Sequence, residues 1–269
     1  MNDIINRICS IVEQVKKSAP LIHCITNPIS INDCANAVLS VGGKPIMAQH
    51  PNEVSEITAV SNAFAANLGN ITDTRLKSIM LSGMTAKKHN IPQIIDIVGV
   101  CCSKLRLEYA QDYISKVHPD IIKGNISEIM ALSGEKYTAN SIDAAKSDIC
   151  LENNIATVKK LSLKAGAVIL ASGKTDIISD GTETSLIYNG CDMLPLITGT
   201  GCMLNVLTGA YLSSGDILGS ALAGAAALGI AGEMSANAHG TGSFKVALMD
   251  NLYNIDSSVI REKIKISRV

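Results

Sequence analysis

The stretch "LIHCITNPISINDCANAVLSVGGKPIM", residues 21–47, joins a short apolar run, a helical run and a second short apolar run. The two apolar runs, "LIHCIT" and "KPIM", have the length and composition of buried strands. Between them, "SINDCANAVLSV" has apolar residues at helical spacing, with Ser30 and Asp33 in the spacing of a capping box, and two glycines follow it. The stretch therefore predicts one unit of strand, helix and parallel strand.

The same alternation continues along the chain and predicts an α/β fold with a mostly parallel central sheet. After residue 200 the pattern is almost entirely helical, and we interpret the uncharged run 217–232 as a buried helix, because it is too short for a membrane span. No linker-like segment interrupts residues 1–269, which we expect to form a single domain. The further predicted strands are "AANLG" from Ala65, "QIIDIV" from Gln93, "DIIK" from Asp120, "AVILAS" from Ala167, and a hairpin of "TDIIS" and "TSLIY" around Asp180 and Gly181.

The composition argues against several classes of partner. The formal net charge is -1 and 17% of the residues are charged, so we expect no basic surface for nucleic acid. We predict neither a signal peptide nor a membrane segment, because the N-terminal helical pattern carries charges throughout. The eight cysteines form no C-x-x-C pair, which favours reduced thiols in a cytoplasmic protein.

A glycine-rich turn, "TGTGC", precedes a helical pattern at residues 198–202. Gly199 and Gly201 let the backbone approach a ligand, and the first turn of a helix presents unpaired N–H groups and a positive dipole end. Such a turn binds anions. It lacks the Lys and Ser or Thr of a P-loop, and tight packing explains the glycines equally well. The sequence leaves both interpretations open.

A carboxylate lies inside an apolar strand in "QIIDIVG", where an ion needs a partner or a metal. Ligands of open α/β sheets bind beyond the carboxyl ends of the strands, and Asp96 is near such an end. A functional role is therefore favoured for Asp96, with a structural salt bridge as the alternative.

The segment "KGNISE" ends another predicted strand, and its Asn125 and Glu128 have the spacing of an N-cap and its N3 partner. Lys123, Asn125 and Glu128 would also stand together at the carboxyl end of a strand, where a cation, an amide and a carboxylate suit a phosphate and its Mg²⁺. Helix capping and phosphate binding are equally compatible with this pattern.

Polar segments also follow the two N-terminal strands. Asn27 and Met47 are placed to line a small-molecule pocket, although methionine is more often core filler. His23, His118 and His239 have no metal-ligand spacing and receive no role.

Five motifs, "HCITNPISINDCAN", "GGKPIMAQHPNEV", "GNISEI", "TGTGC" and "GSFKVALMDNLYNID", resemble the hydroxyethylthiazole kinase family, in order and across essentially the full chain. The resemblance implies a ribokinase-like three-layer α/β/α fold. It implies phosphorylation of the primary alcohol of 4-methyl-5-(2-hydroxyethyl)thiazole for thiamine synthesis or salvage, with ATP as co-substrate and Mg²⁺ as cofactor. It also implies a homotrimer with active sites between subunits.

The resemblance also assigns roles to residues. Cys202 stands where most ribokinase-like enzymes place an Asp as base, and Cys is usual in this family. Backbone N–H groups of Gly199, Thr200, Gly201 and Cys202 would hold the transferring phosphoryl group. At a helix N-terminus the Cys202 thiol is expected to have a lowered pKa, so that it orients the alcohol or accepts its proton late. The remaining matches are Asn27, Met47 and Gly199 for the thiazole, Lys123 and Ser172 for the nucleotide, and Asp96 and Glu128 for Mg²⁺.

The sequence departs from the family pattern on the nucleotide side. The family's Asp-Pro-Val-Gly and following Gly-Ala-Thr are replaced here by "DIVGVCCS", with Ile97, Cys101 and Cys102. Lys123 replaces the usual Arg, which keeps the charge but loses the bidentate fork for phosphate oxygens. "SGK" from Ser172 differs mildly from the usual Thr-Gly-Glu. We expect these departures to change nucleotide affinity or preference rather than the reaction class.

Three other functions compete with the kinase. Ribokinase-like folds include the dehydratases that repair hydrated nicotinamide cofactors, but the segments around Asn27 and Met47 match the kinase. A non-catalytic nucleotide sensor is suggested by Lys123 and the adjacent cysteines, and it is opposed by the retained acidic residue Asp96. A covalent nucleophile at Cys202 needs a base, and no His has an assignable position beside it.

Overall fold

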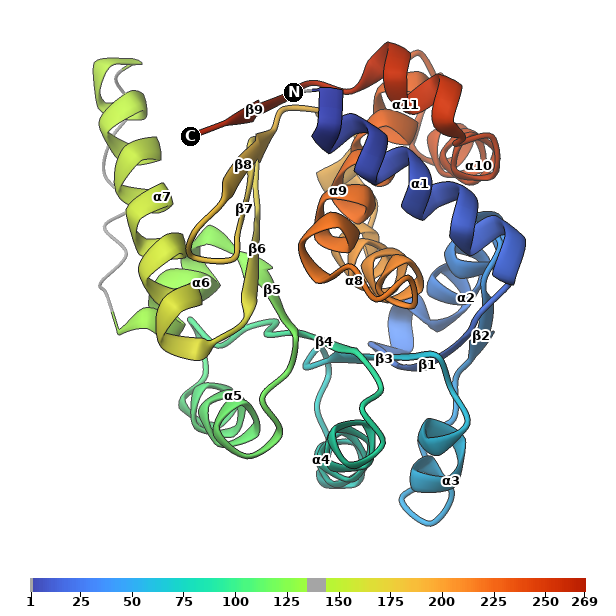
Figure 1. The fold of residues 1–269 in the computed structure, drawn as a ribbon, viewed down its shortest axis with the longest axis vertical. Coiled ribbons are helices and arrows are strands. Elements are labelled where there is room, and N and C mark those ends of the chain that lie inside the picture. The colour runs from blue at the N-terminus through green and yellow to red at the C-terminus, as the bar shows by residue number, and fades with distance from the viewer. Residues whose placement is uncertain (1, 135–143) are drawn as a thin grey trace.

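A computed structural model describes residues 2–134 and 144–269 of the chain. A nine-stranded sheet in the order β2-β1-β3-β4-β5-β6-β7-β8-β9 runs through it (Figure 1). The strands from β2 to β6 are parallel, and β7, β8 and β9 add in antiparallel fashion. The strands are β1 (Leu21–Ile25), β2 (Lys44–Ile46), β3 (Ala63–Asn67), β4 (Gln93–Asp96), β5 (Ile121–Asn125), β6 (Val168–Ser172), β7 (Asp176–Ser179), β8 (Thr184–Ile187) and β9 (Ile266–Arg268).

The predicted strands and their mostly parallel arrangement are confirmed. The predicted hairpin is formed by β7 and β8, and it turns where Gly181 has a φ of 90°. The sequence missed β9, which pairs with β8 near the C-terminus. Three residues are too few to show the two-residue hydrophobic period of a strand. Residues of β9 are extended because they pair with the edge strand β8.

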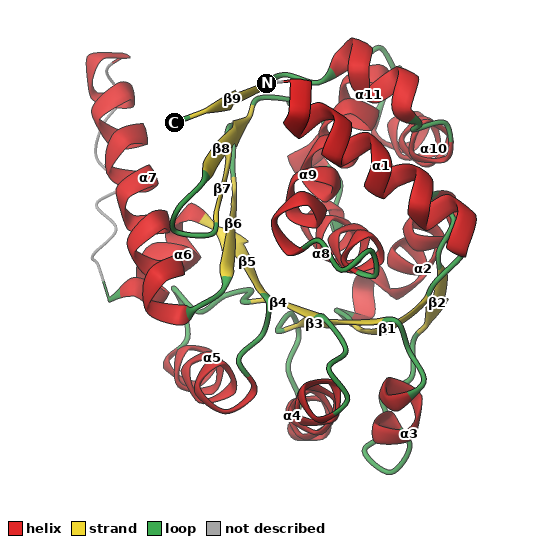
Figure 2. Cartoon of the chain, in the orientation of Figure 1, coloured by secondary structure: helices red, strands yellow, loops and turns green. Residues whose placement is uncertain are grey.

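Helices cover both faces of the sheet and give the predicted three layers (Figure 2). Each face has its own apolar cluster, and adjacent residues of β4 belong to opposite ones, Ile94 to the first and Ile95 to the second. Strands buried on both faces therefore read as continuous apolar runs. One face carries α1 (Asn2–Ser18), α2 (Ile31–Ser40), α8 (Thr200–Leu212), α9 (Ile217–Ser235), α10 (Thr241–Tyr253) and α11 (Ser257–Lys263), and the other carries α3 (Val54–Ala59), α4 (Asp73–Lys88), α5 (Lys104–Val117), α6 (Ile126–Ser133) and α7 (Ala144–Ala165), with the 3-10 turns η1 (Pro28–Ser30) and η2 (Leu194–Leu196) as connections.

The uncharged run near residue 220 forms the buried helix α9, as predicted. By length and composition α9 would pass as a membrane span, but 83% of that window is buried, with α1, α8 and α10 packed against it. Its small residues permit this close packing, because a Cβ on Gly224 would collide with Thr208 of α8.

The capping box predicted for the start of α2 is wrong. Ser30 is the N-cap residue, but its side chain makes no capping bond to the described backbone. Its hydroxyl donates instead to the carbonyl of Asn27 at 3.1 Å, and Asp33 forms an ion pair of 2.8 Å with Lys245 of α10. The prediction fails because the Asp33 carboxylate pairs with Lys245 of a distant helix and not with the backbone at the start of α2.

Candidate active site

Strand register brings three polar side chains together at the carboxyl ends of neighbouring strands. Asn67 of β3 is the register partner of Asp96 of β4, and Asp96 is the partner of Lys123 of β5. Register partners on parallel strands present their side chains to the same face of the sheet. All three side chains are buried there, beneath the first turn of α8.

Asp96 is the centre of this cluster. Its Oδ2 accepts hydrogen bonds from Nδ2 of Asn67 at 2.8 Å and from Nζ of Lys123 at 2.9 Å. Lys123 Nζ also donates to the carbonyl of Gly201 at 3.1 Å, so the cation connects the sheet to α8. The salt bridge considered from the sequence is therefore present. Oδ1 of Asp96, however, is buried and accepts no hydrogen bond from the described residues, which leaves one carboxylate oxygen free for a ligand.

Burial raises the pKa of Asp96 to about 6, against the attraction of Lys123. For Lys123, burial lowers the pKa, but Asp96, Glu128 and Cys202 together raise it by more, so the net pKa is raised. We take Lys123 to be charged, because a carboxylate at 2.9 Å outweighs its burial, and Asp96 to be ionised above about pH 6.

The glycine-rich turn closes over this cluster. Gly199 is the N-cap residue of α8 with a φ of 92°, and a Cβ there would lie 2.8 Å from Cβ of Ser30. Tight packing of Gly199 is therefore confirmed. In the described part of the chain no side chain caps α8, so the N–H groups of Thr200, Gly201 and Cys202 remain available. That these groups bind an anion stays a prediction.

Cys202 lies in the first turn of α8, and its Sγ is 3.5 Å from Nδ2 of Asn67. Burial and the Asp96 carboxylate raise the pKa of the Cys202 thiol, while Ser30, Lys123 and Asn67 act in the opposite direction. The expected low pKa is therefore wrong. The cost of desolvating a buried thiolate exceeds what the helix dipole and the neighbouring cation provide, so Cys202 is a neutral thiol at neutral pH.

Glu128 has the capping role that the sequence allowed. Its Oε2 accepts from the N–H of Asn125 at 2.8 Å, and Oδ1 of Asn125 accepts from the N–H of Glu128 at 3.0 Å, which completes the capping box of α6. Oε1 accepts from the N–H of Gly99 at 2.7 Å and ties the turn after β4 to α6. Among the side chains that the structure describes, in residues 2–134 and 150–269, no three or more His, Cys, Asp or Glu are grouped to hold a metal. A Mg²⁺ role for Asp96 and Glu128 stays a prediction.

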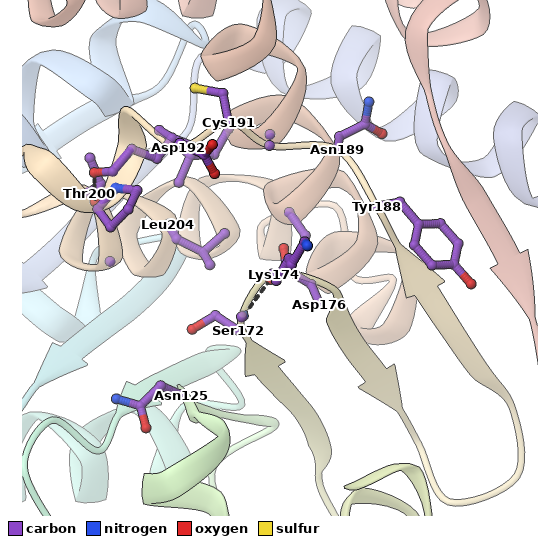
Figure 3. Close-up of a pocket in the computed structure, with 18 residues that line it drawn as sticks. Asn125, Ser172, Lys174, Asp176, Tyr188, Asn189, Cys191, Asp192, Thr200 and Leu204 are labelled. Atoms are coloured by element: carbon purple, nitrogen blue, oxygen red, sulfur yellow. Dashed lines mark hydrogen bonds between the residues drawn. The ribbon is translucent and has the colours of Figure 1, made fainter. Parts of the chain in front are cut away.

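A cavity of about 580 Å³ lies beside the first turn of α8 (Figure 3). Ser172, which the family resemblance assigns to the nucleotide, lines this cavity together with Asn125. Thr200 and Gly201 of the glycine-rich turn also line it. One cavity is therefore lined both by Ser172, which is predicted to contact the nucleotide, and by the turn that is predicted to hold the phosphoryl group.

Three charged residues of the cavity, Lys174, Asp176 and Asp192, were not predicted as site residues. Lys174 is exposed just after β6, and Asp176 begins β7, where its Oδ1 accepts from the N–H of Gly173 at 2.9 Å. Burial raises the pKa of Asp176 to about 7, although part of the side chain faces the cavity. The cavity therefore gains a negative charge near neutral pH. The sequence signal for Lys174 and Asp176 was their charge in the segment "SGKTD", which directly follows a predicted strand.

Comparison with known proteins adds the family. Residues 12–258 match the model of the hydroxyethylthiazole kinase family. The chain belongs to the hydroxyethylthiazole kinase family. Hydroxyethylthiazole kinase 2 of Clostridium botulinum (strain Hall) is 53% identical over 259 residues, covering 95% of this chain and 98% of that protein. The hydroxyethylthiazole kinase of Ruminiclostridium cellulolyticum is 36% identical over 273 residues, covering 100% of both. The resemblance that the five motifs carry is confirmed.

Solved structures agree with this membership of the hydroxyethylthiazole kinase family. A hydroxyethylthiazole kinase protein from Pyrococcus horikoshii OT3 has a TM-score of 0.89 at 31% identity, covering 97% of this chain and 98% of that one. A pyridoxal kinase from Staphylococcus aureus has a TM-score of 0.66 at 14% identity, covering 93% and 97%, and shows a common fold alone. The expected ribokinase-like fold is confirmed.

The two thiazole positions that the hydroxyethylthiazole kinase resemblance assigns to the N-terminal strands lie apart from the cavity. Asn27 follows β1, and its Oδ1 accepts from Nδ2 of Asn70 at 3.0 Å. Met47 follows β2 and packs, half buried, on the apolar cluster that includes Cys202. In the sheet, β3 and β4 separate β1 and β2 from the strands that border the cavity. The thiazole roles stay predictions.

The sequence did not single out Asn67 or Arg75. The buried guanidinium of Arg75 donates to the carbonyls of Thr26, Asn67 and Asn70 at 2.8, 3.1 and 2.6 Å, and so fixes the chain where it leaves β1 and β3. Asn67 had a signal, because it is a polar residue in the predicted strand "AANLG". Arg75 had none, since it reaches the site from α4 only through the tertiary structure.

Proposed function

We propose that this chain transfers the γ-phosphoryl group of ATP to the primary alcohol of 4-methyl-5-(2-hydroxyethyl)thiazole, for thiamine biosynthesis or salvage. The observation that carries the proposal is the first turn of α8, which lies between the Asp96 and Lys123 ion pair and the cavity. Family membership supports the choice of acceptor. We place the protein in the cytoplasm as one domain, residues 1–269, with its eight free cysteines reduced.

In this proposal the nucleotide occupies the cavity. Small-molecule sites measure roughly 300–1,000 Å³, and the cavity falls within that range. Asn125, Ser172 and Lys174 line it, and the phosphates extend toward the N–H groups of Thr200 and Gly201. Lys123 adds positive charge beneath that turn, since its Nζ would lie 3.3 Å from a Cβ on Gly201.

The acceptor alcohol approaches the turn from the side of β1 and β2, near Asn27, Met47 and Gly199. Ile29 of η1, an apolar residue on this side, is largely exposed, at 59%. A homotrimer with active sites between subunits would cover such a residue. Light scattering on the purified protein tests this part: a mass of three chains supports it, and a monomer mass rejects it.

Phosphoryl transfer passes through a loose transition state, so catalysis consists mainly of positioning and charge neutralisation. The first-turn N–H groups of α8 and the Lys123 ammonium neutralise the equatorial oxygens of the transferring group. Cys202, as a neutral thiol, orients the acceptor hydroxyl, whose proton leaves late. Asn67 holds Cys202 and Asp96 in a fixed relative position.

A Mg²⁺ ion fits the acidic side of the site. Oδ1 of Asp96 has no hydrogen-bond partner among the described residues, and the two oxygens of Glu128 accept backbone N–H groups but keep further lone pairs. Mg²⁺ prefers oxygen ligands and keeps several waters. We propose that Asp96 and Glu128 hold the ion, partly through water. When bound, it neutralises charge on the phosphate oxygens.

Turnover of the purified protein tests the function. The protein is offered ATP and Mg²⁺ with the hydroxyethylthiazole and, separately, with the hydroxymethylpyrimidine alcohol, and the products are identified by mass. Phosphorylated thiazole alone supports the proposal. ATP binding without a phosphorylated product from either alcohol rejects it. Asp96→Asn is the matched negative control, because it removes the carboxylate charge and keeps the side-chain shape.

A further inference from the structure

Two adjacent cysteines, Cys101 and Cys102, take no part in the proposed reaction. They lie between β4 and α5, in the segment where the sequence departs from the pattern of the family. Both side chains are exposed, and the two sulfur atoms are 3.4 Å apart. Cys150 is also exposed and serves below as a matched single thiol.

The turn that carries the pair is connected to the acidic side of the candidate site. The N–H of Cys102 donates to the carbonyl of Gly99 at 3.1 Å, and the N–H of Gly99 donates to Oε1 of Glu128 at 2.7 Å. Nη1 of Arg106 donates to the carbonyl of Val98 at 2.9 Å, which ties the same turn to α5. Slight burial, Cys102 and then Glu128 raise the pKa of the Cys101 thiol, so this sulfur atom lies within the electrostatic reach of Glu128. A change of geometry at the pair is therefore passed to Glu128.

We propose that Cys101 and Cys102 form a redox-sensitive modification site, at which a small-molecule disulfide converts the two thiols into an intramolecular disulfide and slows the kinase. One protein thiolate attacks the small disulfide, which forms a mixed disulfide and releases one small thiol. The neighbouring protein thiol attacks the mixed disulfide, the bond between Cys101 and Cys102 forms, and the second small thiol leaves. Two protein S–H bonds are lost, and the small disulfide takes up both protons and both electrons.

A disulfide between the adjacent residues Cys101 and Cys102 closes a small ring, which distorts the turn. Reduction of the disulfide reopens this ring. Adjacent Cα atoms are about 3.8 Å apart, whereas disulfides usually join Cα atoms about 4.4–6.8 Å apart. The short Cα separation strains the ring, and the two sulfur atoms must also approach from 3.4 Å to the disulfide bond length of about 2.05 Å. The turn at residues 101–102 therefore shifts when the bond forms, which disturbs the hydrogen bonds from Cys102 to Gly99 and from Gly99 to Glu128. A bond of distorted geometry is readily reduced. The dithiol is thus the resting form, and the disulfide forms under oxidising conditions.

The effect on rate rests on the proposed kinase function, whereas the thiol chemistry does not. Oxidised glutathione is added to the wild type, to the Cys101→Ala/Cys102→Ala variant and to Cys150→Ala. We expect peptide mapping to show a Cys101 to Cys102 disulfide in the wild type and in Cys150→Ala. Their rates should fall by about threefold or more and recover with dithiothreitol, because small displacements at a site cost rate. The double variant, which still contains Cys202, should keep its rate.

Phenylarsine oxide provides a second measurement that is independent of turnover, because it bridges two neighbouring thiols. We expect one adduct on the wild type and on Cys150→Ala, and none on the double variant. Free thiols at Cys101 and Cys102 after oxidised glutathione, or an adduct on the double variant, would overturn the site. A disulfide that leaves the rate unchanged, or equal inactivation of the double variant, would overturn its link to the kinase.

Discussion

Lys123 and Asp96 form an ion pair of 2.9 Å in which 5% and 1% of the side-chain surfaces are exposed. The same ammonium group bonds to the carbonyl of Gly201, so the pair joins β4 and β5 to the first turn of α8. Removing one partner of such a pair leaves the other charge buried without compensation.

Lys123→Met is expected to lower the free energy of unfolding by about 3–5 kcal/mol, because Asp96 then stays buried without its cation. Lys123→Arg keeps the charge and is expected to lose much less. Denaturant unfolding of the wild type and both variants at pH 7.5 measures the difference. Equal losses in the two variants would mean that the charge of Lys123 does not stabilise the fold.

Gly199 and Gly215 share a left-handed backbone, with φ values of 92° and 84°, and differ in crowding. Gly199→Ala is expected to lower kcat by about tenfold or more, because the new Cβ would lie 2.8 Å from Cβ of Ser30 and displace the turn. Gly215→Ala is the matched control, since no described atom lies within 4 Å of its Cβ. It should cost about 1 kcal/mol of backbone strain and leave kcat unchanged. Similar kinetics for both variants would contradict the role of the turn.

Asn67→Leu removes the amide that bonds to Asp96 and contacts Cys202, while it keeps the size of the side chain. We expect kcat to fall by about tenfold to a hundredfold, with a much smaller change in KM, because Asn67 positions reacting groups and does not bind substrate. Asn67→Asp places a second carboxylate beside Asp96 and raises its pKa, so the acid limb of the pH–rate profile should move to higher pH. An unshifted limb would indicate a structural role alone.

Cys202→Ser is expected to slow turnover by less than about tenfold, because the neutral thiol orients the alcohol and no strong base is required. The raised pKa of Cys202 also predicts that its thiolate adds no rise in rate between pH 6 and 8, so wild type and variant should have pH–rate profiles of the same shape. Steady-state kinetics across that range provide the measurement. Complete loss of turnover with both substrates still bound would contradict this limited role.

Asp176 predicts a dependence of stability on pH. Burial raises its pKa in the folded protein from 3.8 to about 7, so the folded chain binds this proton more tightly than the unfolded chain. The stability that Asp176 contributes is therefore fully present below about pH 4 and is lost as the pH rises through about 7.

Asp176→Asn cannot ionise, so its Tm relative to the wild type should be higher at pH 8 than at pH 5, as measured by calorimetry. Its KM for ATP at pH 8 should also be lower, because the cavity then carries one carboxylate charge fewer to repel the phosphates. A Tm difference that is the same at both pH values would show that Asp176 does not titrate in this range.

The sequence by itself determined the local structure and the family. The strands from β1 to β8 could be predicted because each is a short apolar run bounded by turn residues, and the capping box of Asn125 and Glu128 because its partners are three positions apart. The sequence also marked Asp96 as a charge inside an apolar strand.

Tertiary structure alone decided what surrounds these residues. Lys123 and Asp96 are 27 positions apart, and Asn67 and Cys202 are 135 apart, so sheet register and the docking of α8 decide that they meet. The same packing buries Cys202 and reverses the pKa shift that its helix position predicts. Local patterns depend on residues a few positions apart, whereas burial and charge depend on every segment that packs against a group, and those segments come together only in the folded chain.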